Sequence, residues 1–144
     1  MAVGAPETAA PALRDTLRVD GVALAHALVE RVSDHLPARI ELELVGDLIE
    51  IRALGAKYGG GTVLIDISES LAMRHDVGEA LQLACERFLS TLQDAVAEAS
   101  AEPWPGTHFM PDAHVAVSRS EISLRFVHDG SDVLTLRPIP RGVE

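Results

Sequence analysis

The chain is poor in several residue types that mark familiar classes of protein. Its 144 residues include one cysteine, Cys85, which excludes an internal disulfide and a structural zinc site of the Cys-rich type. No apolar run reaches the length of about 18 residues that a membrane-spanning helix needs. Positive charge is scarce too, because 12 Lys and Arg residues stand against 22 Asp and Glu residues, a formal net charge of −10. Such a chain is repelled by a phosphate backbone or an anionic membrane, so we expect no nucleic-acid and no membrane partner.

The rest of the composition is that of an ordinary globular domain, with 47% apolar and 24% charged residues. The length fits one domain, which we place at residues 19–144. Residues 1–18 are predicted to be a flexible tail, because Pro6 and Pro11 interrupt any helix there and the small side chains bury little surface. This tail lacks the basic and apolar regions of a signal peptide, so we expect a cytoplasmic protein.

Hydrophobic periodicity predicts two helices and six strands. Apolar residues three and four apart predict helices at residues 20–36 and 76–100, each opened by an aspartate that can cap it, Asp20 and Asp76. Alternating apolar residues predict strands at residues 38–44, 48–54, 62–67, 113–118, 121–128 and 133–137. The order α-β-β-β-α-β-β-β indicates an α+β fold of two layers, with a mainly antiparallel six-stranded sheet, or sheets, covered on one face by the two helices.

A glycine-rich segment at residues 55–61 is the most conspicuous local feature. It could cradle a phosphate, with Lys57 as the counter-charge and Gly59, Gly60 and Gly61 as the ligand-binding backbone. It lacks the Gly-Lys-Ser/Thr tripeptide of a P-loop, and a strand follows it where a helix would be needed. A hairpin connection whose glycines supply positive φ is the preferred interpretation.

Histidines and acids suggest a second candidate site. His108, Asp112 and His114 lie close together in the sequence and could supply three ligands to a divalent metal ion. Their spacing matches no metal-binding motif, so unrelated surface side chains are the preferred interpretation. Cys85 falls inside the apolar stripe of the second predicted helix and is expected to be a buried structural thiol. We assign no catalytic residue, no metal ligand and no cofactor.

The segment between the second helix and the fourth strand carries the only Trp of the chain. Trp104, Phe109 and Met110 stand here among prolines and a glycine, which limit the entropy cost of holding these side chains in place. Aromatic and Met side chains either fold back to seal one end of the core or form an interface with a partner. Leu83, which falls off the main stripe of the second helix, adds to the interface hypothesis.

These observations favour a non-catalytic protein-interaction or adaptor domain, acidic and soluble. Its expected partners are another protein, a second copy of itself in a homodimer, or both. The alternative is a small-molecule- or metal-binding enzyme that uses the glycine loop at residues 55–61 together with His108, Asp112 and His114. No motif in the chain indicates a biological pathway, and none is specific to a known family.

Overall fold

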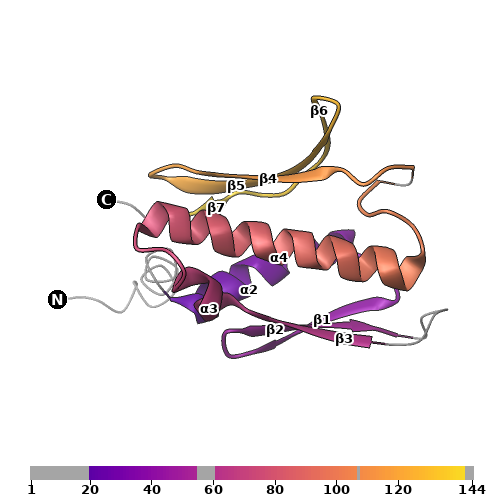
Figure 1. The fold of residues 1–144 in the computed structure, drawn as a ribbon, viewed down its shortest axis with the longest axis horizontal. Helices are drawn as coiled ribbons and strands as arrows, with labels where there is room; N and C mark the ends of the chain where they lie inside the picture. The colour runs from indigo at the N-terminus through magenta and orange to yellow at the C-terminus, as the bar shows by residue number, and fades with distance from the viewer. Residues whose placement is uncertain (1–19, 55–60, 107, 142–144) are drawn as a thin grey trace.

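The computed structural model describes residues 20–54, 61–106 and 108–141. Helices occupy a middle layer, with one antiparallel sheet on each side of it (Figure 1). The α+β class is confirmed, and the order of the two long helices and the strands is as predicted. The strands divide between two sheets, and the helices lie between these sheets, whereas the sequence suggested helices on one face only.

The first helix, α2 (Gly21–Val32), begins where the sequence predicts. The Asp20 carboxylate caps it by accepting hydrogen bonds from the backbone N–H groups of Val22, at 2.9 Å, and Ala23, at 3.4 Å. A short 3-10 turn, η2 (Ser33–His35), follows before Pro37. Leu24 and Leu28 are fully buried, so the inward face of α2 serves the core.

Three strands, β1 (Ile40–Val45), β2 (Leu48–Ala53) and β3 (Gly61–Asp66), form the first sheet in the order β1-β2-β3. Gly46 has a φ of 65° in the two-residue turn between β1 and β2, a conformation that costs glycine little. On the outer face, Arg52 forms ion pairs with Glu43 and Glu50. Glu43 belongs to β1, so its ion pair with Arg52 links two neighbouring strands.

The third strand ends one residue earlier than predicted, because a short helix, α3 (Ile67–Leu71), begins at Ile67. Asp66 caps this helix by accepting a hydrogen bond from the backbone N–H of Glu69, at 2.9 Å. This helix was not predicted, because its five residues are too few to show helical periodicity. Its signal is the Asp-x-x-Glu spacing at residues 66–69, which matches the one that opens the next helix.

The longest helix, α4 (Val77–Ser100), runs through the middle of the molecule and contacts both sheets (Figure 1). Asp76 caps it through the backbone N–H of Glu79, at 2.9 Å, as predicted. Phe88 is fully buried at the centre of the predicted stripe, and Leu89, which was outside that stripe, is fully buried too. The buried surface of α4 is therefore wider than the sequence pattern indicated, and this width explains why the helix is covered by a sheet on either side.

The second sheet contains β4 (Asp112–Val117), β5 (Glu121–His128), β6 (Ser131–Thr135) and β7 (Ile139–Pro140). They are ordered β4-β5-β6, and β7 also pairs with β5. Asp129 and Gly130 both have positive φ, 51° and 77°, as the type I′ turn that is typical of an Asp-Gly hairpin requires. β6 begins two residues before the predicted strand at residues 133–137. β7 was not predicted, because its Pro140 has no backbone N–H to donate to a sheet.

Arg31 connects α2 to the end of the second sheet through two hydrogen bonds. Its Nε donates a hydrogen bond to the carbonyl of Arg137 at 3.3 Å, and its Nη2 donates one to the carbonyl of Pro138 at 3.0 Å. Desolvation by burial, with the nearby Arg137 charge, lowers the pKa of Arg31 from its usual value. In the part of the chain that the structure describes, no helix is long and apolar enough to cross a membrane.

Candidate functional site

The connection between α4 and β4, residues 101–111, is held against α4 by one buried side chain. The amide nitrogen of Gln93 donates hydrogen bonds to the carbonyls of Trp104, at 3.2 Å, and Pro111, at 2.8 Å. Gln93 is 5% exposed, so these bonds form away from water, where an unpaired amide would be costly. The two acceptors lie seven positions apart, and one amide therefore fixes both ends of the segment between them.

Trp104 is the residue around which this end of the molecule is built. It is buried, its indole Nε1 donates to the carbonyl of His35 at 2.9 Å, and its ring meets Phe126 edge-on with centroids 5.4 Å apart. The peptide bond from Trp104 to Pro105 is cis. The indole thus joins the end of η2 to β5, which fits the interpretation that Trp104 seals the core.

The other three residues of the predicted interface differ in their surroundings. Phe109 is half-buried and stacks on His128 with ring centroids 3.8 Å apart, and Met110 is 43% exposed beside it in the chain. Leu83 is half-buried on α4, ten residues before Gln93, which is about 15 Å along the helix axis. The structure therefore brings Trp104, Phe109 and Met110 to one end of the molecule and leaves Leu83 apart from them.

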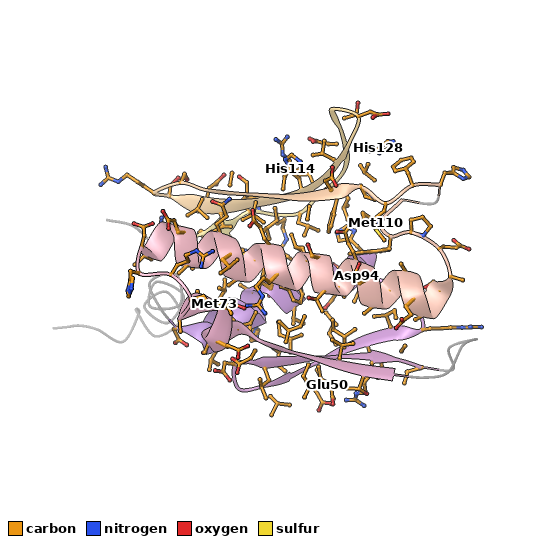
Figure 2. All side chains as sticks on the ribbon, in the orientation of Figure 1. Glu50, Met73, Asp94, Met110, His114 and His128 are labelled. Carbon is orange, nitrogen blue, oxygen red and sulfur yellow. The ribbon has the colours of Figure 1, made fainter. Side chains whose placement is uncertain are left out.

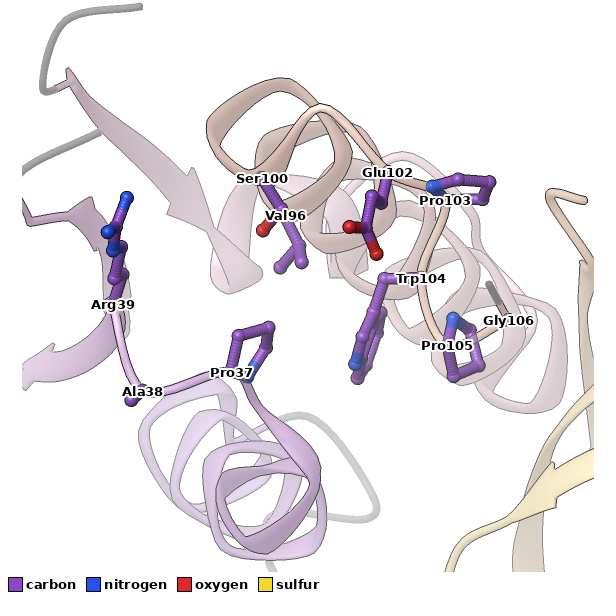
Figure 3. Close-up of a pocket in the computed structure, with 10 residues that line it drawn as sticks. All are labelled: Pro37, Ala38, Arg39, Val96, Ser100, Glu102, Pro103, Trp104, Pro105 and Gly106. Atoms are coloured by element: carbon purple, nitrogen blue, oxygen red, sulfur yellow. The ribbon is translucent and has the colours of Figure 1, made fainter. Parts of the chain in front are cut away.

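A pocket of about 500 Å³ opens beside Trp104 (Figure 3). Three segments build it: the turn that precedes β1, the last turns of α4, and the first part of the connection that follows α4. Proline rings and the indole form much of its wall. Its lining residues are Pro37, Ala38, Arg39, Val96, Ser100, Glu102, Pro103, Trp104, Pro105 and Gly106.

Two ionisable side chains line this pocket. Arg39 lies on one side of it, Glu102 and Trp104 lie on the other, and Val96 lies between them (Figure 3). A smaller hollow of about 290 Å³ shares Glu102 with the pocket and is lined by Met110 as well. The arrangement can hold an apolar group against proline and indole rings, with one positive and one negative charge at its margin.

The glycine-rich segment lies largely outside the described residues, and with it Lys57, Gly59 and Gly60. Gly61 opens β3, and a Cβ placed on it would meet nothing within 4 Å. Asp112 and His114 are exposed on β4, and His108 is exposed in the preceding segment. Among residues 20–54, 61–106 and 108–141, no three His, Cys, Asp or Glu side chains are grouped so that they could hold a metal ion.

Cys85 is fully buried, as predicted. Burial, with the nearby charge of Glu86, raises the pKa of its thiol to about 12. The thiol therefore stays protonated at neutral pH, a state in which it is a poor nucleophile.

Sequence reasoning missed Gln93, although a signal for it exists. Gln93 follows Leu89 by four residues and precedes Val96 by three, so it lies on the buried face of α4. A lone polar side chain on an apolar face indicates a buried hydrogen bond. Compared with protein-family models, curated proteins and solved structures, the chain matches none.

Proposed function

We propose that this chain is a non-catalytic protein-interaction domain, and that the pocket beside Trp104 binds an extended segment of a partner protein. The observation that carries the proposal is the pocket itself, whose wall contains Pro37, Pro103 and Pro105 around an indole. Proline and tryptophan rings offer rigid apolar surface at little entropy cost, which is why such grooves suit extended peptide segments.

The rigidity of the site supports this proposal. Gln93 and His35 hold the Trp104 backbone and indole, so binding would not have to order them. Gly106 packs so tightly under Phe109 that a Cβ there would lie 2.9 Å from the Phe109 carbonyl oxygen. A preformed site loses less conformational entropy on binding than a mobile one.

The negative charge of the chain and of Glu102 in the pocket indicates which residues the partner segment carries. The whole chain carries −10 at neutral pH, and Glu102 lines both the pocket and the neighbouring hollow. The segment that fits best carries a large apolar side chain next to a basic residue, which would pair with Glu102 on the side of the pocket away from Arg39. Opposite charge also raises the rate of encounter with such a partner.

Site-specific photo-crosslinking tests this function. A crosslinking residue is placed at Ala38, which is exposed and lines the pocket, and in a parallel chain at Ala116, which is exposed on β4. We expect Ala38 to capture a discrete partner in the native cell and Ala116 not to capture it. Filling the pocket with Ser100→Trp should abolish the capture, whereas Ser90→Trp, at an exposed position on the same helix, should not. Equal capture from both positions, or capture that survives Ser100→Trp, would contradict the proposal.

A further inference from the structure

The outer edge of β3 is open. β3 is the last strand in the order β1-β2-β3, and no other strand of the described residues pairs with that edge. Leu64 is 61% exposed and Val63 is 36% exposed. Both are aliphatic residues of the kind that strands bury.

This edge also lacks the features by which sheets usually prevent unwanted pairing. Its six residues, Gly61–Asp66, include no Lys, Arg or Pro. The opposite edge, β1, carries Glu41 and Glu43. In the second sheet, Pro140 lies in β7, and β6 is joined to β5 through an irregular register. β4, the remaining edge, also contains no Lys, Arg or Pro, but none of its large apolar side chains is exposed. The exposed Leu64 distinguishes the β3 edge and indicates that β3 has a partner strand.

The hydrogen bonds between β2 and β3 show which backbone N–H and C=O groups of β3 point toward its open edge. The N–H of Ile67 donates to the carbonyl of Asp47 at 3.1 Å, so residue 67 points its backbone groups toward β2. In an antiparallel pair this direction alternates along the strand. Ile65 and Val63 therefore also bond to β2, while the N–H groups of Thr62, Leu64 and Asp66 face the open edge.

We infer that β3 pairs with the β3 of a second copy of this chain, antiparallel and around a twofold axis, with Leu64 directly opposite the partner's Leu64. This arrangement keeps the outer faces of both sheets on one side and makes a six-stranded sheet across the dimer. Each Leu64 donates its N–H to the carbonyl of the partner's Leu64, and each Asp66 N–H meets the carbonyl of the partner's Thr62. The inference stands independently of the proposed pocket.

The same register makes the side chains complementary. Val63 lies opposite the partner's Ile65 on the inner face, so the exposed part of Val63 becomes covered. The one acid of the strand, Asp66, lies opposite the hydroxyl of the partner's Thr62 rather than another carboxylate. A strand that matches itself in both hydrogen bonding and charge suits a second copy, because a twofold interface must be self-complementary.

Negative charge on the rest of the molecule is expected to weaken the β3–β3 dimer. Asp94 is exposed on α4, on the same side of the molecule as β3 (Figure 2). Two copies that each carry a formal net charge of −10 repel one another, and salt screens that repulsion. An edge contact is also smaller than a standard interface. We therefore expect a weak dimer that tightens as salt increases.

Cysteine crosslinking tests the register directly. In the inferred dimer the Cα atoms of Leu64 and the partner's Leu64 are about 5.5 Å apart, within reach of a disulfide. The full-length Leu64→Cys chain should form a covalent dimer under mild oxidation. Thr62→Cys is the matched control on the same edge, because the two Thr62 residues are four positions out of register and about 13 Å apart. Equal crosslinking of the two variants would overturn the register.

Sedimentation of the unmodified chain tests the dimer itself. Association should strengthen between about 0.05 and 0.5 M salt. Leu64→Lys should raise the dimer dissociation constant about tenfold or more, whereas Val45→Lys, at a position 56% exposed on the opposite edge, should leave it unchanged. A thermal melt of each variant establishes that it is folded. A chain that remains monomeric up to about 0.1 mM, or one in which both lysine variants dissociate equally, would overturn the inference.

Discussion

The indole Nε1 of Trp104 donates a hydrogen bond to the main-chain carbonyl of His35, 69 positions earlier in the chain, at 2.9 Å. This bond joins the segment after α4 to the end of the first helical region. The Trp104 ring also meets Phe126 of β5, so one side chain connects three parts of the fold. Its removal should therefore affect folding before it affects any binding.

Trp104→Ala should lower the free energy of unfolding by about 3–5 kcal/mol, because it leaves a cavity where a buried aromatic ring stood. Trp104→Phe should cost less, since a ring remains while the hydrogen bond to His35 is lost, about 1 kcal/mol for that bond. Urea unfolding measures both values. If Trp104→Ala leaves stability unchanged and alters only the oligomeric state, then Trp104 acts as an interface anchor and not as a seal.

We expect the buried amide of Gln93 to contribute measurably to the free energy of unfolding. Gln93→Leu places an apolar side chain of similar size on α4 and leaves the carbonyls of Trp104 and Pro111 without their donor. We expect a loss of about 1–3 kcal/mol in the free energy of unfolding. Gln82→Leu is the matched control, because Gln82 is exposed on the same helix and its amide bonds to the exposed side of that helix at Glu86. Equal losses in the two variants would show that the buried bonds contribute nothing specific.

Ala101 ends α4 in the left-handed conformation, with a φ of 60° and a ψ of 25°. This conformation strains any residue with a Cβ, and glycine is the usual choice at such a position. Ala101→Gly should therefore stabilise the protein by about 0.5–1 kcal/mol, despite the greater freedom of glycine in the unfolded chain. Ala97→Gly, one turn earlier in the helix, should destabilise it by about 1 kcal/mol. Thermal unfolding of the two variants should give shifts of opposite sign.

Local chemistry allowed the sequence to predict much of the fold. Asp20 and Asp76 cap the helices that they were expected to cap, and the Asp129-Gly130 turn forms as its residue types require. These features depend on neighbours within a few positions. The division into two sheets depends instead on how wide a face α4 buries, and Leu89 belongs to that face without standing out in the one-dimensional pattern.

The candidate site was harder to predict for the same reason. Aromatic and proline residues identified the segment that contains Trp104. The pocket beside it also needs Pro37 and Arg39, which lie more than sixty positions away in the sequence. Pro37 and Arg39 reach the pocket because η2 packs against the segment that contains Trp104. The spacing of residues in the sequence does not predict this packing.

Cys85 should make stability depend on pH in the alkaline range. In the unfolded chain its thiol has an ordinary pKa of about 8.5, whereas burial in the folded chain raises the pKa to about 12. Above pH ~8.5 the unfolded chain releases a proton that the folded chain keeps. The contribution of this group is therefore fully present below that pH and is lost as the pH rises through about 12.

The Cys85→Ala variant isolates this contribution from other groups that titrate in the same range. At pH 7 it should be less stable than the original chain, because it lacks the buried sulfur. Between about pH 9 and 10.5 the original chain should lose stability more steeply, by up to about 1.4 kcal/mol per pH unit, the value for one proton. Urea unfolding at several pH values measures the difference, and a thiol reagent should label Cys85 only after the chain has unfolded. Parallel slopes for the two chains, or rapid labelling of the folded protein, would show that the thiol is accessible to solvent.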